Sequence, residues 1–229
     1  NSLNSRYYTN TFWWTYQTKT KESMKIGPKE KYCRKFGYKM LWNDRCASAK
    51  CGLLRRRQRP GMHGHKPRVL SLYGKQLLEK QRLKLSYLLN ETKLKNYVLL
   101  AKKSKKTAPD ALIELLERRL DNVIWRAGYA SSKLAARQLV SHGHFLVNGR
   151  KIKSHSYLVN KDDVIEIRPQ SKNIKPFENI HNKLKFYQSP SWLEVDKENL
   201  KITVVKLPEA TEIQHTFNLP LVIDFYSRQ

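Results

Sequence analysis

The sequence predicts an α+β fold, with a largely helical N-terminal domain and a small unit of two helices on a short antiparallel sheet. Two observations carry this prediction. Leucines recur near helical spacing from about residue 69 onward. From residue 144 the chain instead alternates apolar and polar residues around an Asn-Gly pair, as a β-hairpin does. The length of 229 residues allows one or two domains, and we see no internal repeat.

The charge of the chain points to a polyanionic partner. Lys and Arg number 45 against 19 Asp and Glu, a formal net charge of +26. Nucleic acid is the commonest polyanion that such a potential attracts, and a merely basic surface is the alternative. We expect no membrane partner, because no apolar run approaches the roughly 18 residues that a spanning helix needs. Three cysteines, an odd number, argue against a closed disulfide framework and fit a reducing compartment.

Composition divides the chain into five segments. The first, residues 1–24, is an arm rich in Ser, Thr, Asn and aromatic residues. We expect it to dock on a partner, with a flexible tail as the alternative. Its composition is compatible with an organelle precursor but lacks the Arg-rich amphipathic pattern of a transit peptide. The other segments are an irregular Cys- and Arg-rich segment (25–68), a helical domain (69–114), the small unit of two helices and a sheet (115–172), here called the inserted unit, and a C-terminal segment (173–229).

Helices are predicted first along the chain. The stretch 69–106 carries Leu at helical spacing with Lys and Arg between. Thr107 is a plausible N-cap, and an apolar stripe follows it until Gly128 ends the helix. Beyond residue 172, "LKITVV" and "LPLVIDFY" have the composition of strands.

The inserted unit continues with a second helix and a hairpin. Ser131 or Ser132 caps the helix "KLAARQLVSHG", and Gly143 suits the left-handed position just past its end. "HFLV" then alternates as a strand, and Asn148-Gly149 predicts a two-residue turn. "DDVIEIR" supplies a further strand.

The end of this helix and the hairpin carry polar side chains that suit RNA. His142 and His144 form only a weak zinc signal, since no carboxylate or cysteine stands near them in sequence. Donors along one edge would instead meet phosphates and sugar hydroxyls, with a solvated face as the alternative. The candidate RNA-binding residues here are Lys133, Arg137, Gln138, Ser141, His142, Arg150 and Lys151.

A second basic cluster lies upstream. Between Asp44 and Glu79 there is no acidic residue, so this span would repel itself without a polyanion. Arg donates two bonds at once to phosphate, and Gly61 and Gly64 allow close backbone approach. A solvated loop or a nuclear targeting signal is the alternative. The candidate RNA-binding residues are Arg55, Arg56, Arg57, Arg59, His63, His65, Lys66 and Arg68.

The stretch "LLERRLDNVIWRAGYASSKLAARQLVSHGHFLVNGRKIKSHSYLV" closely resembles the S4 RNA-binding domain. The segment "RPGMHGHKPRVLSLYGKQLLEKQ" is similar to the "RPGQHG...YGxQLxEKQ" segment of the small-subunit ribosomal protein S4 family, and "PSWLEVD" and "LVIDFYSR" resemble that family's end. The chain departs from it at Met62, where glutamine is usual. The resemblance covers residue 25 to the C-terminus.

The resemblance implies a structural protein of the small ribosomal subunit. It also implies that the largely helical N-terminal domain embraces an inserted S4 domain and that the C-terminal segment, 173–229, packs back on the helical domain. It implies early binding to the 5′ domain of small-subunit rRNA, a place near the mRNA entrance, neighbouring ribosomal proteins as partners, and neither catalysis nor a small-molecule substrate. The ending favours a mitochondrial ribosome, with a chloroplast ribosome as the alternative. S4 domains also occur in RNA-modifying enzymes and stress-response RNA-binding proteins, but a Gly-rich phosphate loop and paired carboxylates in an apolar surround are not seen in this sequence.

Zinc is the cofactor that the resemblance raises. Zinc-binding relatives carry Cys-x-x-Cys where this chain has Glu30 and Cys33, and Cys46 and Cys51 lie downstream. Three outcomes stay open: zinc held by the three thiols with Glu30 or another fourth ligand, a decayed site with free thiols, or a different cofactor.

Overall fold

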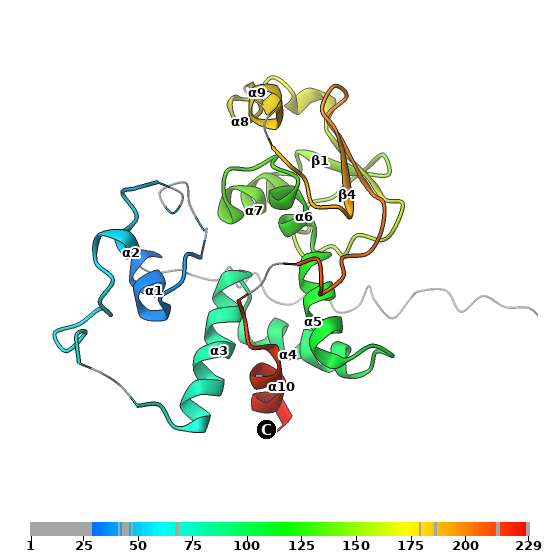
Figure 1. Ribbon diagram of the computed structural model, residues 1–229. Coiled ribbons are helices and arrows are strands. Elements are labelled where there is room, and N and C mark those ends of the chain that lie inside the picture. The colour runs from blue at the N-terminus through cyan, green and yellow to red at the C-terminus, as the bar shows by residue number, and fades with distance from the viewer. Residues whose placement is uncertain are drawn as a thin grey trace, which may run out of the picture.

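The computed structural model describes residues 29–40, 42, 46, 48–66, 69–178, 180–185, 187–213 and 216–227. The N-terminal arm of residues 1–24 and the predicted RNA-binding Arg68 lie outside the described residues. Figure 1 shows a helical lower part, a mixed helix and strand part above it, and a separate lobe around the first two helices. Within the described residues, no helix is long and apolar enough to cross a membrane.

Four helices build the helical domain, three before the inserted unit and one at the end of the chain. They are α3 (Leu72–Ser86), α4 (Glu91–Lys102), α5 (Ala108–Glu117) and α10 (Leu219–Ser227). Ser71 caps α3 by accepting from the Gly74 amide, and Thr107 caps α5 as predicted. The fully buried side chains of Leu94, Leu112 and Val222 lie in their common core, so both ends of the sequence complete one domain.

The lobe before α3 holds α1 (Lys29–Phe36) and the short α2 (Gly52–Arg55). Its small core joins Cys33, Met40 and Trp42 to Leu88, which follows α3. The Trp42 indole donates to the Leu85 carbonyl over 2.8 Å. The lobe is therefore held to the C-terminal end of α3, while the chain between α2 and α3 loops away from it (Figure 1).

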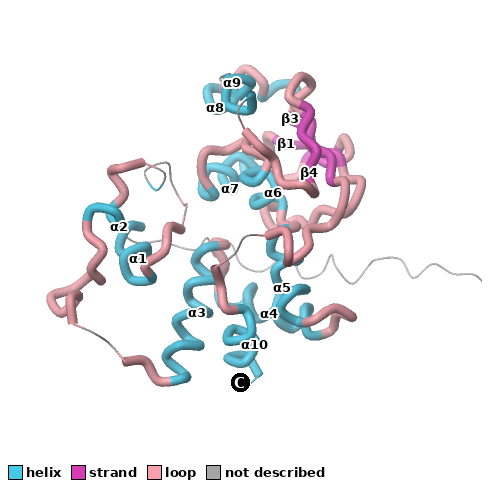
Figure 2. The backbone as a smooth tube through the Cα atoms, in the orientation of Figure 1, coloured by secondary structure: helices cyan, strands magenta, loops and turns pink. Residues whose placement is uncertain are grey.

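The inserted unit packs α6 (Leu120–Arg126) and α7 (Lys133–His142) against a sheet, where Figure 2 shows the strands gathered. Five antiparallel strands run in the order β2-β1-β3-β5-β4. Their bounds are β1 (Phe145–Val147), β2 (Arg150–Lys151), β3 (Val164–Ile167), β4 (Leu193–Asp196) and β5 (Lys201–Val204). Between β3 and β4 lie a 3-10 turn, η3 (Pro169–Ser171), and two short helices, α8 (Lys175–Glu178) and α9 (Ile180–Lys185).

The predicted caps and turn of this unit are confirmed. Ser132 accepts from the Ala135 amide at the start of α7, and Gly143 ends the helix at φ 74°. Asn148 and Gly149 both have positive φ, at 49° and 75°, as a two-residue hairpin turn requires. The turn therefore fixes the position of β2 beside β1.

The prediction of one helix from Thr107 to Gly128 is wrong. The chain leaves helical geometry at Arg119, whose ψ is 135°, and Arg119 forms an isolated β-bridge with Leu158. The buried Arg119 side chain donates twice to Asp121, over 3.0 and 2.6 Å. The helix therefore breaks at Arg119 although the apolar stripe continues past it. Hydrophobic spacing alone does not reveal such a break in the backbone.

The segment after residue 172 divides between the two domains. "LKITVV" forms β5 as predicted, and β4 and β5 extend the sheet of the inserted unit. "LPLVIDFY" is a helix, α10, so its strand prediction is wrong. Val222 is buried in the core that Leu83 of α3 shares, with Tyr226 packed against it, and burial there overrides the preference of such residues for strands. The α+β class, with a helical domain and a small antiparallel sheet, is confirmed.

Candidate nucleic-acid interface

The first candidate surface is the basic loop between α2 and α3, of which the structure describes residues 55–66. Arg55, Arg56 and Arg57 are exposed, and within the described residues none of them forms an ion pair with a carboxylate. His63, His65 and Lys66 are exposed as well, and Arg59 is partly exposed. The loop therefore presents cations whose donors are available to phosphates.

Internal hydrogen bonds give the basic loop a defined shape. The Arg59 guanidinium donates to the Lys66 carbonyl, which closes the loop on itself. Arg34 of α1 donates to the Gln58 carbonyl over 3.0 Å and braces the loop from the lobe. A Cβ at Gly64 would lie 2.0 Å from the Arg59 carbonyl oxygen, so only glycine fits there without moving the backbone.

The second candidate surface is the helix–hairpin edge, which comprises Gln138, Ser141, His142, Arg150 and Lys151. All five side chains are exposed. A Cβ at Gly143 would lie 2.5 Å from Lys151 Cε, so the Lys151 stem lies directly against the helix end. The end of α7 and strand β2 thus bring their polar groups together, as the sequence predicts. That these groups contact RNA stays a prediction.

Positive charges at the helix–hairpin edge lie close enough to lower one another's pKa values. The positive charge of Arg168, with smaller contributions from burial and Lys153, lowers the pKa of Lys151. Burial, followed by the charges of His142 and Lys151, lowers the pKa of His144. Cations that repel one another in this way bind a polyanion favourably, because its charge removes the repulsion.

Three further members of this cluster, His144, Lys153 and Arg168, are not among the RNA-binding residues predicted from the sequence. Arg168 donates its backbone N–H to the His144 carbonyl over 2.9 Å, because β3 pairs antiparallel with β1. Lys153 lies two residues after Lys151, a spacing that the period of an extended chain would have placed on the same side. No local pattern predicts that Arg168 belongs to this cluster, because only the pairing of β3 with β1 brings it beside His144.

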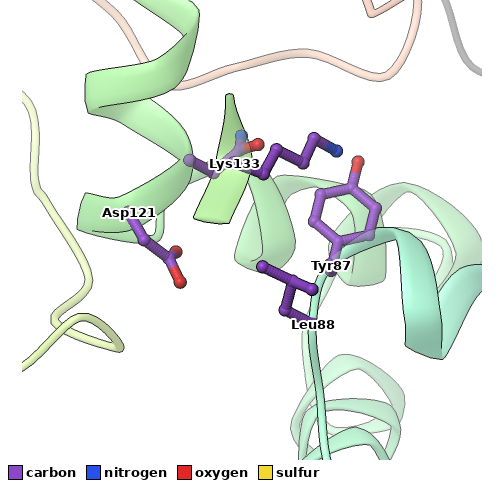
Figure 3. Close-up of a pocket in the computed structure, with 5 residues that line it drawn as sticks. Tyr87, Leu88, Asp121 and Lys133 are labelled. Carbon is purple, nitrogen blue, oxygen red and sulfur yellow. The ribbon is translucent and has the colours of Figure 1, made fainter. Parts of the chain in front are cut away.

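Lys133 and Arg137 do not lie on the exposed edge where the sequence placed them. Both are partly buried on the side of α7 that faces α3. The Lys133 ammonium donates to the Ser86 carbonyl over 3.1 Å, and the Arg137 guanidinium donates to the Leu88 carbonyl over 2.6 Å. In Figure 3 the Lys133 side chain extends beside Tyr87, where the helical domain meets the inserted unit. This placement corrects the predicted geometry of these two residues.

The cysteines are all buried in the lobe before α3. Burial, the largest cause, raises the pKa of Cys33 to about 11 together with the neighbouring thiols of Cys46 and Cys51, although a backbone hydrogen bond at Met40 acts to lower it. Glu30 reaches the same place, because a Cβ on Gly52 would lie 2.4 Å from its Oε2. Even so, in the part of the chain that the structure describes, no three His, Cys, Asp and Glu side chains are arranged ready to hold a metal ion.

Comparison with known families and proteins agrees with this architecture. Residues 24–117 match the family model for the ribosomal protein S4/S9 N-terminal domain, and residues 118–165 match the S4 domain. The chain is 46% identical to the small ribosomal subunit protein uS4 of Caldicellulosiruptor bescii over 204 residues, 89% of this chain and 98% of that protein. It is 45% identical over 211 residues to uS4 of Aquifex aeolicus, with the same coverage of each chain.

The boundary between the two family matches coincides with the structural break at Arg118 and Arg119, where the helical domain gives way to the inserted unit. Both parts are present in one chain, in the same order, and the relatives are covered almost from end to end. The chain therefore belongs to the ribosomal protein S4 family.

Proposed function

We propose that the protein is a structural constituent of the small ribosomal subunit that binds folded rRNA without catalysing a reaction. One observation carries the proposal: the chain has two exposed cationic surfaces, the basic loop and the helix–hairpin edge, on a fold shared with small-subunit proteins. Side chains of Arg, Lys and His recognise folded RNA through phosphates and 2′-hydroxyls, so the mechanism is electrostatic and shape-based.

The finer part of the proposal concerns the place of binding. We infer that the RNA is the 5′ domain of small-subunit rRNA, bound early in assembly, and that the protein lies among other small-subunit proteins near the mRNA entrance. The support is the resemblance of "RPGMHG" and "YGKQLLEKQ" to the family's corresponding segment.

Filter binding of the full chain to a 5′-domain transcript, across a salt series with excess tRNA, tests the proposal. Binding should survive the tRNA and weaken steeply as salt rises, because each neutralised phosphate releases condensed counter-ions. Binding that tRNA abolishes, or a nearly flat response to salt, would contradict it.

An RNA-modifying enzyme with an appended S4 domain is the competing function. We infer no catalysis, since the chain's two domains are accounted for by the helical domain and the inserted unit. Release of tritium from RNA labelled at uridine is the direct assay, and turnover by the purified chain would establish the enzyme instead.

A mitochondrial ribosome is our proposed location, and a chloroplast ribosome is the alternative. The support is limited to the sequence, in the composition of the 1–24 arm and the ending "LPLVIDFYSR". The relatives described above are bacterial and give an organelle no support. Fractionation with an antibody against the chain decides the location: recovery with cytosolic ribosomes would refute it.

We also propose that Cys33, Cys46 and Cys51 bind zinc, with Glu30 or another group as the fourth ligand. Three buried thiols and a carboxylate are donor types that zinc accepts, and binding would deprotonate the thiols and cross-link α1 to the start of α2. Elemental analysis of the purified chain should give one zinc per chain, falling on Cys33→Ser substitution. A value near zero for the unaltered chain would leave the thiols free.

A further inference from the structure

The C-terminal end of α3 is one place where the helical domain and the inserted unit touch through charged groups, and the ion pair between Glu117 of α5 and Arg126 of α6 is another. α3 ends at Ser86, and Leu88 then adopts a left-handed φ of 55°. The carbonyls of these two residues accept hydrogen bonds from Lys133 and Arg137, over 3.1 and 2.6 Å. The last carbonyls of a helix lack intrahelical partners and carry the negative end of its dipole, so two cations are well suited to them.

Both cations come from one face of α7. Lys133 and Arg137 are four residues apart, a spacing that stacks side chains one turn above the other on a helix. Ser132 caps the same helix, which fixes the direction of its first turn. The pair therefore contacts α3 as a rigid two-point attachment rather than as two independent side chains.

The surroundings of the pair are packed. The Lys133 ammonium lies 4.5 Å from the Tyr87 ring centre and 4.7 Å from that of Trp125, as a cation over aromatic faces. Arg137 Nε lies 3.7 Å from an Asp121 oxygen. The cavity at this point, shown in Figure 3, has a volume of only ≈ 10 Å³, about enough for one water.

The same end of α3 also holds the lobe that braces the basic loop. Trp42 donates to the Leu85 carbonyl over 2.8 Å, and the Ser86 hydroxyl contacts the Met40 sulfur at 3.0 Å. The helix–hairpin edge begins at the other end of α7. A change in the angle between α7 and α3 would therefore move one cationic surface relative to the other.

We propose that Lys133 and Arg137 are positioning residues that hold the basic loop and the helix–hairpin edge in one fixed arrangement for a single folded RNA. The inference rests on the proposed rRNA binding and deepens it. In this proposal Lys133 and Arg137 hold the two domains together and do not contact RNA. The RNA partner must then present two phosphate clusters at a fixed separation. Two surfaces on one rigid body bind such an RNA as a unit, because the second contact costs little further ordering.

The first experiment changes charge but keeps a donor. Lys133→Gln can still donate to the Ser86 carbonyl, while Arg150→Ala removes an exposed cation as the matched control. In a salt series with the 5′-domain transcript, positioning predicts that Lys133→Gln keeps the salt slope, whereas Arg150→Ala lowers it by about one phosphate. A slope lowered by about one in Lys133→Gln would overturn the proposal, because Lys133 would then neutralise a phosphate.

The second experiment removes the attachment. The variant is Lys133→Met/Arg137→Met, and the measurement is the distance between the two domains by single-molecule energy transfer. In both the unaltered chain and the variant, one dye is attached at the exposed position 95 of α4 and the other at the exposed position 161 beside the sheet. The unaltered chain should give one narrow distance distribution and the double variant a broad one, with affinity for the transcript reduced roughly tenfold at an unchanged salt slope. The conservative variant Arg137→Lys, with Lys133 unaltered, keeps a cationic donor and should show the narrow distribution of the unaltered chain. A distribution that stays narrow in the double variant would refute the proposal.

Circular dichroism and urea unfolding first establish that the variants fold. If the double variant does not, the single variant Arg137→Met goes through the same distance and salt measurements, with the same refuting outcome. The distance measurement needs no RNA. The two proposals can therefore fail separately. If tRNA abolishes binding by the unaltered chain but the distance distribution still broadens in the double variant, the rRNA proposal is refuted and the positioning role of the two cations remains.

Discussion

The two ends of α7 put similar side chains to opposite uses. At its start, Lys133 and Arg137 donate to backbone carbonyls of another domain. At its end, His142 lies exposed beside Lys151 in a cluster of positive charge. One helix thus carries cations that hold the molecule together and polar groups that are free to hold a partner.

The difference shows that charge alone does not mark a binding surface. What separates the two regions is bonding: Lys133 and Arg137 donate to carbonyls, whereas among the described residues the side chains of His142 and Lys151 have no hydrogen-bond or ion-pair partner. Asp121 lies close to Arg137, whereas the groups that shift the pKa of Lys151 are themselves positive. The first region should respond to mutation in stability and the second in RNA affinity and its salt dependence.

The largest expected effect is a loss of stability when a buried charge near the start of α7 loses its partner. Asp121→Ala leaves Arg119 buried without its carboxylate, and breaking such a pair costs about 3–5 kcal/mol of unfolding free energy. Urea denaturation followed by circular dichroism measures it. Glu209→Ala, which removes an exposed carboxylate, is the control and should change the value by less than about 0.5 kcal/mol. Equal effects of the two variants would remove the distinction between buried and exposed charge.

A second test alters the shape of the basic loop without removing charge. Gly64→Ala would place a methyl group against the Arg59 carbonyl, so the loop must open. We expect rRNA affinity to fall about tenfold, roughly 1.4 kcal/mol, with little change in unfolding free energy. Gly74→Ala in α3 is the control, since its Cβ would meet only ordinary contacts at 3.4 Å. Unchanged binding of Gly64→Ala would mean that the loop's shape does not matter.

A third test probes the exposed side. Lys151→Ala should weaken binding to all RNA sequences by a similar factor and lower the salt slope by about one, as the loss of one phosphate contact does. Its unfolding free energy should stay within about 0.5 kcal/mol of the original, because the side chain is exposed. A stability loss with an intact salt slope would assign Lys151 to structure.

The smallest expected effect is a pH dependence in the helical domain. Burial alone would raise the pKa of Glu91, but hydrogen bonds from Lys80, Tyr226 and Lys84 outweigh burial and lower it to about 2. The ionised form is thus favoured in the folded state, so its stabilisation is present above the ordinary pKa of 4.5 and is lost as pH falls from 4.5 towards 2. Stability measured in this interval should fall less in Glu91→Gln; an identical acid dependence would contradict the assignment.

Much of the fold could be predicted from local signals. The Thr107 and Ser132 caps, the left-handed Gly143 and the Asn148-Gly149 turn each depend on residues within a few positions, and each was found. The helical form of 219–227 was not, because its composition favours a strand and only packing beside α3 decides otherwise. The break at Arg119 depends on a β-bridge to Leu158, almost forty residues away.

The candidate site divides in the same way. Arg150 and Lys151 follow a turn whose geometry is local, so their exposure could be predicted. Lys133 and Arg137 lie on a helix whose neighbours come from residues 86–88, and nothing in the spacing reveals which face α3 covers. Arg168 joins the cluster only through pairing of β3 with β1.

The return of the chain to α3 through α10 has a consequence for synthesis. The inserted unit completes its core with Trp192, Ile202 and Val204, but the core of the helical domain lacks Val222 until the last residues are made. Domains fold as units, and N-terminal parts usually fold first during translation. Here the helical domain, though it begins earlier, closes after the inserted unit, so a nascent chain would expose the apolar sides of α3 and α5 until its last residues are made.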